Sequence, residues 1–347
     1  MGKLYTEHEG RVISANNLFR HVMAITLDSR TNYRQGVLRC ITSRSGDLAF
    51  KGNIDRSELH KIKGETLEHF ELGEKLNIKN EKEIIEKLTE DGGDFIGLED
   101  PDIWIDKKTD LMHLYFTIPI KPKKENAEKG EKTKIHLGHA VGKDLDSLEM
   151  TPPVLLDTEK FSAKEVSIAP VNSKGIRYNL IESRDRKNDT TYSTVQVAIA
   201  RHMDRVWEYG HIAFHPKDHD MPWIAGHASP GPLFSKDFID VGEGKLLGVI
   251  NGCEANQKIG KETKYGNFSI GLFIYDYEHG KIDWVSEKPF IEDSEAGKGG
   301  GRAITFASFF VETGKGEGVL YAHVDDSFVR AYTLKADLLK SILPVIK

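Results

Sequence analysis

The sequence predicts an all-β fold, and within that class a five-bladed β-propeller with a short helical insertion and a C-terminal helix. Three observations support this prediction. Apolar residues come in short β-rich runs that Gly, Asp, Asn and Lys turns separate. A strand–turn–strand theme recurs five times, the last copy being shortened. Sustained helical periodicity is rare and is limited to two short segments.

The recurring theme consists of an alternating apolar strand, a polar turn and a short apolar or aromatic stretch. Its copies are VLRCITSRSGDLAF from Val37, IHLGHAVGKDLDSLEM from Ile135, VQVAIARHMDRVWEYG from Val195, FSIGLFIYDYEHGKIDWV from Phe268 and the shortened VRAYTLKADLLKSIL from Val329. A further pair of strands precedes most copies, which gives four strands per unit, as in a propeller blade. Because the spacing between copies is uneven, a β-sandwich of similar strand number is the alternative.

The two helical segments and two insertions complete the predicted organisation. Helical periodicity appears at residues 81–88 and 336–343. The first segment lies in a polar, partly helical insertion at residues 54–95. A second insertion, at residues 121–134, is almost entirely charged, so we expect a solvent-exposed hairpin tip there. Since each blade of a propeller packs only on its neighbours, one domain spanning residues 1–347 accommodates the whole chain.

Composition excludes several classes of partner. The formal net charge of -6 argues against a general nucleic-acid binder, which needs a basic face, and weakly against an anionic membrane surface. No apolar run is long enough to span a membrane. Cys40 and Cys253 are too few to indicate a disulfide framework, and the start of the chain lacks the apolar core of a signal peptide. We therefore expect a reducing, cytoplasmic setting, and nothing in the sequence indicates a cofactor.

The most informative motif is GLEDPDIW at residues 97–104, which opens the second unit. Glu99, Asp100 and Asp102 stand where an innermost strand would begin, at the mouth of the propeller channel. Like charges held close together raise each other's pKa, which keeps a carboxylic acid protonated near neutral pH. Pro101 fixes the local backbone and so aims its neighbours. A solvated acidic turn is the simpler interpretation of these residues taken alone.

Charged or Gly/Pro-rich segments recur at the start of other units. Lys164 and Glu165 open the third unit, residues 229–233 open the fourth, and Arg302 opens the fifth; Asp326 lies in a turn of the last unit. Equivalent places in a propeller converge on one end of its axis. Cleavage of a glycosidic bond needs such a ring, because one acid protonates the leaving oxygen while a second carboxylate or a phosphate attacks or activates water.

These motifs resemble those of the five-bladed propeller glycosidases, and most of all glycoside hydrolase family 130, the mannoside phosphorylases and mannosidases. Residues 99–103 are similar to that family's E-D-P-R-[IV] motif. Residues 229–252 resemble its G-x-G-P-P…G-W-L-x-[IL]-Y-H-G block, and residues 320–327 with 338–339 resemble its Y-Y-G-A-A-D-T…L-L ending. The likeness runs in order from about residue 97 to residue 343.

The resemblance implies that Asp100 is the catalytic acid and that Asp326 binds a sugar. The chain also departs from the family pattern. Asp102 replaces the arginine of the first motif, and Asn251 replaces the histidine of the second. Glu182 stands in place of the histidine in a segment similar to Y-x-M-L-H-R. Phosphorylases need cations to hold phosphate, so the loss of such residues favours hydrolysis.

The sequence therefore predicts a glycoside hydrolase that acts on a β-linked oligosaccharide, with mannose as one candidate sugar. The alternatives are a phosphate-dependent mannoside phosphorylase, a furanosidase or xylosidase of a related five-bladed family, and a non-catalytic carbohydrate-binding propeller. The expected partners are the oligosaccharide and, for a phosphorylase, phosphate. The predicted catalytic residues are Asp100, Glu165, Glu182 and Glu254, the three glutamates being candidates for the general base. The predicted substrate-binding residues are Glu99, Asp102, Lys164, Asn251, Arg302, Asp326 and Trp223.

A histidine-rich loop is the remaining candidate site. His215, His219 and His227 lie close together in the sequence with two aspartates, but their spacing matches no metal-binding signature. We therefore predict a polar loop and no metal. Trp223 in the same loop either stacks on a sugar ring or packs the loop against the protein.

Overall fold

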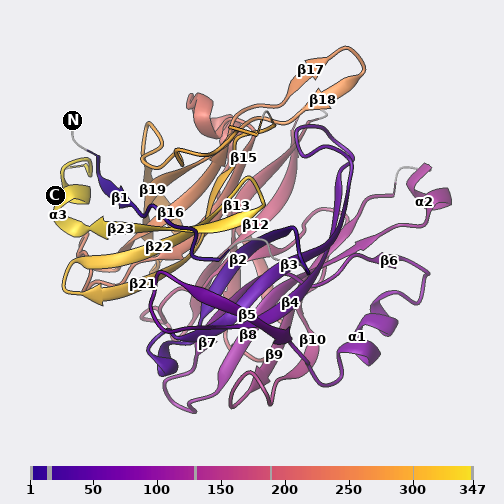
Figure 1. The fold of residues 1–347 in the computed structure, drawn as a ribbon, viewed down its shortest axis with the longest axis horizontal. Helices are drawn as coiled ribbons and strands as arrows, with labels where there is room; N and C mark the ends of the chain where they lie inside the picture. Colours follow the sequence, from indigo (N-terminus) through magenta and orange to yellow (C-terminus); the bar gives the residue numbers. More distant parts are fainter. Residues whose placement is uncertain (1–2, 14–17, 129–130, 188–189, 300, 345–347) are drawn as a thin grey trace.

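The computed structural model describes residues 3–13, 18–128, 131–187, 190–299 and 301–344, and its strands radiate from a common centre (Figure 1). The mostly β composition is as predicted. The first sheet has the order β2-β3-β4-β5. Its strands are β2 (His21–Leu27), β3 (Gln35–Ser45), β4 (Ile54–Gly64) and β5 (Phe70–Lys75). In the second sheet, β7 and β6 both pair with β8, which continues to β9 and β10. These strands are β6 (Asp94–Phe95), β7 (Glu99–Ile105), β8 (Met112–Lys121), β9 (Lys134–Gly142) and β10 (Glu149–Leu155).

The third sheet consists of two antiparallel halves. A single parallel bridge between Ser193 and His227 joins them. The first half contains β11 (Lys164–Ser167), β12 (Arg177–Lys187), β13 (Thr190–Ala200) and β14 (Glu208–Phe214). The second half contains β15 (His227–Leu233), β16 (Lys245–Cys253), β19 (Phe268–Asp276) and β20 (Lys281–Val285). Between β16 and β19, a separate hairpin of β17 (Gln257–Ile259) and β18 (Glu262–Lys264) projects at the edge of the molecule (Figure 1).

The last sheet joins the two ends of the chain. It has the order β1-β23-β22-β21 and contains β1 (Tyr5–Glu7), β21 (Thr305–Gly314), β22 (Glu317–Val324) and β23 (Phe328–Lys335). The N-terminal strand β1 therefore completes a sheet whose other strands come from the C-terminal end. In the antiparallel register, Tyr5 lies opposite Leu334.

Buried apolar clusters connect these sheets in a cycle. One cluster joins the first sheet to the second, and another joins the second to the first half of the third. A third cluster joins the two halves of the third sheet to each other. A fourth joins the second half of the third sheet to the last sheet. A fifth joins the last sheet back to the first. Each sheet is thus buried between two neighbours, because its apolar side chains need cover on both faces.

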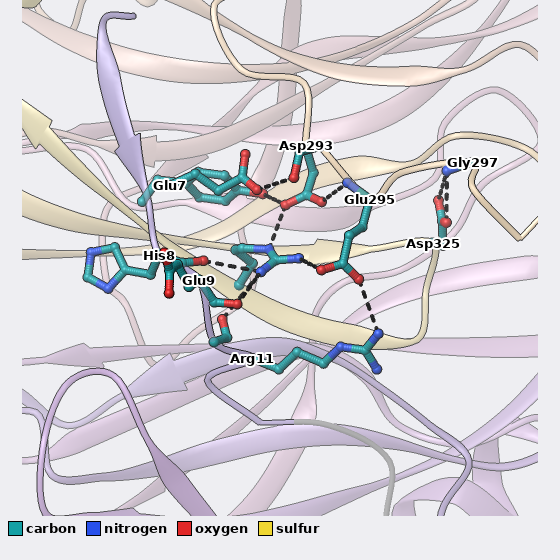
Figure 2. A network of polar contacts seen from close by, with 12 residues as sticks. Glu7, His8, Glu9, Arg11, Asp293, Glu295, Gly297 and Asp325 are labelled. Atoms are coloured by element: carbon teal, nitrogen blue, oxygen red, sulfur yellow. Dashed lines mark hydrogen bonds and ion pairs between the residues drawn. The ribbon is translucent and has the colours of Figure 1, made fainter.

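A buried polar network fastens the N-terminal segment to the last sheet (Figure 2). Arg330, of which 1% is exposed, donates to the Asp293 carboxylate over 2.8 Å and to the backbone oxygen of His8 over 3.1 Å. Its other end contacts Glu295 at 2.6 Å, and the Tyr332 hydroxyl donates to Asp293 over 2.6 Å. Because charge-assisted hydrogen bonds satisfy every one of these groups, the buried charges are tolerated.

The helices agree with the prediction, whereas one insertion does not. Helices α1 (Glu81–Leu88) and α3 (Ala336–Lys340) lie in the two predicted segments. The expected insertion at residues 54–95 is largely wrong, because its first part forms β4 and β5 of the first sheet. Lys and Glu side chains interrupt the apolar alternation of these strands, which hid it in the sequence. The insertion at residues 121–134 connects β8 to β9 and contains α2 (Lys124–Glu128); its residues 129 and 130 lie outside the described part.

Within the described residues, no helix combines the length and the apolar character that a membrane crossing requires. Cys40 and Cys253 are both buried and unpaired with each other, as the sequence indicated.

Candidate active site

Five strands meet around one cavity at the centre, and each of them carries a β-bulge. In β2, β7, β11, β15 and β21 the pairing register shifts in mid-strand. A bulge turns one side chain out of the normal alternation and re-aims it. Residues at or beside all five bulges line the same central cavity: Ala24, Asp100, Glu165, Pro230 and Ser308.

Two of these bulged residues carry carboxyl groups on a strained backbone. Asp100 has a φ of 49° and Glu165 a φ of 53°, in the left-handed region that non-glycine residues seldom adopt. Such a conformation costs on the order of 1–3 kcal/mol per residue and persists only where the surrounding packing enforces it. Here it brings the two carboxyl groups from neighbouring sheets into hydrogen-bonding contact.

The two carboxyl groups separate two cavities along the axis. The axial pocket, of about 380 Å³, is lined by both of them together with Arg39, Lys164 and Asp326, among others. The rear cavity, of about 190 Å³, lies behind them and is otherwise more apolar. Asp100 and Glu165 are the two residues that line both spaces. They therefore form the floor of the axial pocket.

The carboxyl pair holds its charge unequally. Burial raises the pKa of Glu165 well above its ordinary value, and the adjacent charge of Asp100 raises it further. Burial acts in the same direction on Asp100, but Arg39 and Lys164 outweigh it and lower the pKa of Asp100. Because the two pKa shifts are opposite in direction, Glu165 holds the proton of the pair more tightly than Asp100 does.

Arg39 holds the acidic motif in place. Its guanidinium contacts the Glu99 carboxylate at 2.6 Å and the Asp100 carboxylate at 2.8 Å. Only 8% of Arg39 is exposed. Burial and the charge of Asp100 raise the pKa of Glu99 to about 7, despite the ion pair with Arg39. Arg39 is not among the residues predicted from the sequence, because it lies inside a strand, β3, with no motif around it.

Lys164, Glu182 and His227 form a second polar chain beside the carboxyl pair. The Lys164 ammonium lies 3.4 Å from one oxygen of Glu182, and His227 Nε2 lies 2.8 Å from the other. Burial alone would raise the pKa of Glu182, but His227 and Lys164 lower it to about 2. Since both of its oxygens are engaged, Glu182 positions Lys164 and His227. It does not face the axial pocket, as a general base must.

Asp326 lies at the rim of the axial pocket, in the turn between β22 and β23. Burial would raise its pKa, but His323, at 3.2 Å, lowers it to about 2 together with Arg44 and Arg39. Its neighbour Asp325 accepts hydrogen bonds from the backbone nitrogens of Gly297 and Ile304, each at 2.9 Å, so it anchors both ends of the segment that carries Arg302 (Figure 2 shows the Gly297 contact).

Arg302 provides a cation in the pocket wall. Its guanidinium lies over the rings of Phe268 and Tyr265, 4.5 Å and 5.1 Å from their centroids. It also donates to the Sγ atom of Cys253 over 3.1 Å. In the part of the chain that the structure describes, Arg302 forms no ion pair with a carboxylate, unlike Arg39 and Lys164.

Four predicted site residues lie away from the axial pocket. Asp102 lines the rear cavity, where burial raises its pKa to about 7. Asn251 is fully buried, and its amide bonds both the nitrogen and the oxygen of Ala307, at 2.8 Å and 3.0 Å. Trp223 packs in an apolar cluster with 8% of its surface exposed. Glu254 is exposed and lines a neighbouring groove. None of these four is in place to contact a substrate in the axial pocket.

The histidines of the predicted polar loop do not converge. His215 lies 3.5 Å from Asp185, His219 stacks on Phe214, and His227 points into the axial pocket. Among the described residues, no group of three or more His, Cys, Asp and Glu side chains is placed to hold a metal ion. His227 and His323 line the axial pocket, although neither is among the predicted catalytic or substrate-binding residues.

Solved structures of carbohydrate-active enzymes have folds similar to that of this chain. No protein-family model and no curated protein sequence matches the chain. A β-1,2-mannobiose phosphorylase from Listeria innocua, in complex with β-1,2-mannobiose, is 13% identical, and the match covers 97% of this chain and 99% of that chain with a TM-score of 0.64. A glycosyl hydrolase from Bacteroides ovatus is 14% identical, with coverage of 96% and 94% and a TM-score of 0.61.

A third similar structure is a mannose phosphorylase from Leishmania mexicana in complex with a phosphate ion. It is 13% identical, with coverage of 98% of this chain and 92% of that chain and a TM-score of 0.54. These likenesses extend over nearly the whole chain at low identity, so they concern the fold. The chain has the fold of the β-propeller glycosidases and phosphorylases, which the sequence motifs resemble.

Proposed function

We propose that this chain is a glycoside hydrolase that cleaves a β-linked oligosaccharide at the floor of the axial pocket, with a mannoside as the leading candidate substrate. The observation that carries this proposal is the Asp100–Glu165 pair. It presents one protonated and one ionised carboxyl group, in contact with each other, to a polar pocket. A group that stays protonated at neutral pH is what a glycosidic leaving oxygen requires.

The pair acts as one proton donor in this proposal. The sequence motif assigned the acid role to Asp100 alone, whereas the order of the pKa values leaves the proton on Glu165. When the glycosidic bond breaks, the leaving oxygen takes this proton, and Lys164 and Arg39 stabilise the resulting pair of carboxylates. Loss of the proton next to two cations costs less than it would in an uncharged pocket.

Asp326 is the second carboxylate of the proposed mechanism. Glycosidases keep their two carboxyl groups about 5 Å or more apart, so that a sugar ring fits between them. Asp100 and Glu165 are in direct contact, so they cannot take both roles. Asp326 lines the same pocket and is ionised. We therefore assign the general base, which activates water, to Asp326. The sequence had offered Glu165, Glu182 and Glu254 for this role.

Phosphorolysis is the second candidate, and Arg302 favours it. Within the described residues this guanidinium has no carboxylate partner, so it is available to an oxyanion such as phosphate. The other two cations of the pocket, Arg39 and Lys164, are neutralised by carboxylates. A single available cation is a poor match for a phosphate dianion, and hydrolysis is therefore the favoured reaction.

We also propose that the architecture is a five-bladed propeller forming one domain over residues 1–347. Two features support this count. Five strands with a bulge surround the central cavity, and five apolar clusters connect the groups of four or five strands in a cycle. The eight-stranded sheet counts as two blades, since one bridge between Ser193 and His227 joins its halves.

A screen of 4-nitrophenyl glycosides with and without inorganic phosphate tests the proposed reaction. We expect release of free sugar from a β-glycoside at the same rate in both conditions. Release of a sugar phosphate, and only when phosphate is present, would replace the hydrolase by the phosphorylase. The absence of cleavage for all pyranosides and furanosides, combined with saccharide binding, would favour a non-catalytic propeller.

A further inference from the structure

A second hollow adjoins the axial pocket and belongs to none of the roles above. This side groove, of about 780 Å³, lies between β13, the segment of residues 216–226 and the loop that follows β16. It shares Thr191, Tyr192, Gly226 and Asn256 with the axial pocket. The two spaces are therefore continuous, and a ligand seated on the carboxyl pair can extend sideways into the groove.

The side groove is equipped for hydroxyl groups. Lys217 and Asp220 line one wall and Glu254 the other, and all three are exposed. Among the described residues none of them is engaged in an ion pair. One oxygen of Glu254 accepts a hydrogen bond from the backbone nitrogen of Asn267 over 3.2 Å, and the other is available to a ligand, as are the side chains of Lys217 and Asp220. Tyr192 stands where the groove meets the axial pocket. A row of polar groups beside an aromatic ring suits a sugar, which has hydroxyl edges and an apolar face.

The walls of the groove are held firmly by the core below them. Trp223 lies under the wall segment and packs so closely on Gly252 and Gly271 that a Cβ atom on either glycine would come within 2.3 Å of its ring. At Gly226, a Cβ would approach the backbone oxygen of Glu254 to 2.4 Å. The two walls are thus in direct contact at the base of the groove, and the groove keeps its shape without a ligand.

From these observations we propose that the side groove binds further sugar units of the substrate, so that the protein prefers oligosaccharides of three or more sugars over disaccharides. The inference rests on the proposed function, which places one end of the chain on the carboxyl pair. Remote sugar units in a preformed groove add binding energy that a short substrate lacks. The groove thereby selects for chain length, independently of the sugar at the cleavage point.

Filling the groove tests the proposal. Ala255 is exposed and lines the groove, so Ala255→Trp blocks it without disturbing the core. The matched control is Ala127→Trp, at an exposed position in α2. Calorimetric titration measures the dissociation constants of β-linked manno- and gluco-oligosaccharides of two to five units, and every protein titrated also carries Glu165→Gln so that the ligands are not cleaved. We expect the protein with the unaltered groove and the Ala127→Trp protein to bind a trisaccharide about tenfold more tightly than the disaccharide, and the Ala255→Trp protein to lose this preference.

The outcomes separate this inference from the proposed function. Equal affinity of the protein with the unaltered groove for disaccharides and longer chains would overturn the groove assignment, as would an undiminished preference in Ala255→Trp. Cleavage of a 4-nitrophenyl monoglycoside, measured in parallel, depends on the carboxyl pair and not on chain length. If the protein cleaves this short substrate but shows no chain-length preference, only the proposal of sugar binding in the side groove is refuted. If binding depends on chain length but no glycoside is cleaved, only the proposal of a hydrolase is refuted.

Discussion

Glu165 and Asp100 stand on neighbouring sheets, each at a β-bulge with a positive φ, and their carboxyl groups share one hydrogen bond between two cavities. Neither residue could occupy this position in a regular strand, because the normal alternation would turn the side chain to one face of its blade. The strained backbone at the two bulges therefore brings the two carboxyl groups together. Their contact makes the two pKa values differ, and the proposed catalysis depends on that difference.

The first prediction concerns the proton on this pair. Glu165→Gln keeps the shape of the side chain but has no proton to donate, so we expect kcat to fall by about 10²–10⁴-fold. Asp100→Asn should have an effect of similar size, because the two groups act as a unit. Activity on a 4-nitrophenyl glycoside and the far-ultraviolet circular dichroism spectrum are the measurements. Glu292→Gln, at an exposed position, is the control, and full activity in Glu165→Gln would exclude Glu165 as the acid.

The second prediction concerns the alkaline limb of the pH profile. The positive charge of Lys164 lowers the pKa of Glu165, against the larger effects of burial and of Asp100. Lys164→Met removes that charge, so the pKa of Glu165 should rise and the alkaline limb of kcat/KM should move to higher pH. Lys164→Arg retains the charge and should leave the limb in place. A shift of the limb to lower pH in Lys164→Met would mean that another group governs it.

The third prediction concerns stability and its dependence on pH. The pKa of Glu182 is about 2 in the fold, against an ordinary value of 4.5. Its ion pairs therefore stabilise the fold at all pH values above about 4.5, and their contribution disappears as the pH falls through about 2. Glu182→Gln leaves Lys164 without its partner in a buried place, so we expect a loss of about 3–5 kcal/mol at pH 7.

Urea unfolding of the wild-type protein and Glu182→Gln at pH 7 and at low pH measures this effect. The difference in unfolding free energy between the two proteins should shrink as the pH falls. A constant difference from pH 7 to pH 3 would show that the loss does not come from the charge of Glu182. Glu292→Gln again serves as the control for a carboxylate without a buried partner.

The fourth prediction separates a structural amide from a ligand contact. Asn251 bonds both the nitrogen and the oxygen of Ala307, and so links β16 to β21. Asn251→Ala leaves two buried backbone groups without partners, at about 1–3 kcal/mol each. We expect a lower urea midpoint and an unchanged KM at a temperature where the variant is folded. A raised KM at full stability would return Asn251 to the substrate-binding residues.

The sequence predicted the β architecture and the acidic floor of the pocket for a physical reason. The β-rich runs and their turns are local signals, and equivalent unit starts in a propeller have to converge on its axis. Glu99, Asp100, Lys164, Glu165, Arg302 and Asp326 all line the axial pocket, as expected. The strands of residues 54–75 escaped notice because their exposed Lys and Glu side chains mask the apolar alternation.

The errors in the predicted site also have physical causes. Alternation places Asp102 on the same side of its strand as Asp100, but the bulge between Glu99 and Asp102 sends Asp102 to the rear cavity. Trp223 lies in a single 3-10 turn and Glu254 in a loop, and no periodic pattern in the sequence encodes the course of such segments. Arg39 could not be identified, because a buried arginine becomes an ion-pair partner only through residues 60 positions away in the sequence.

The pairing of the N-terminal strand β1 with β23 has a consequence for the synthesis of the protein. Asp100 and Glu165, at the floor of the axial pocket, leave the ribosome well before Asp326 and before Arg330, whose network fastens the first strand. Until β21, β22 and β23 have been synthesised, β1 has no partner strand and the first sheet lacks the neighbour that covers one of its apolar faces. A chain truncated before β23 therefore keeps these apolar side chains exposed to solvent and to chaperones.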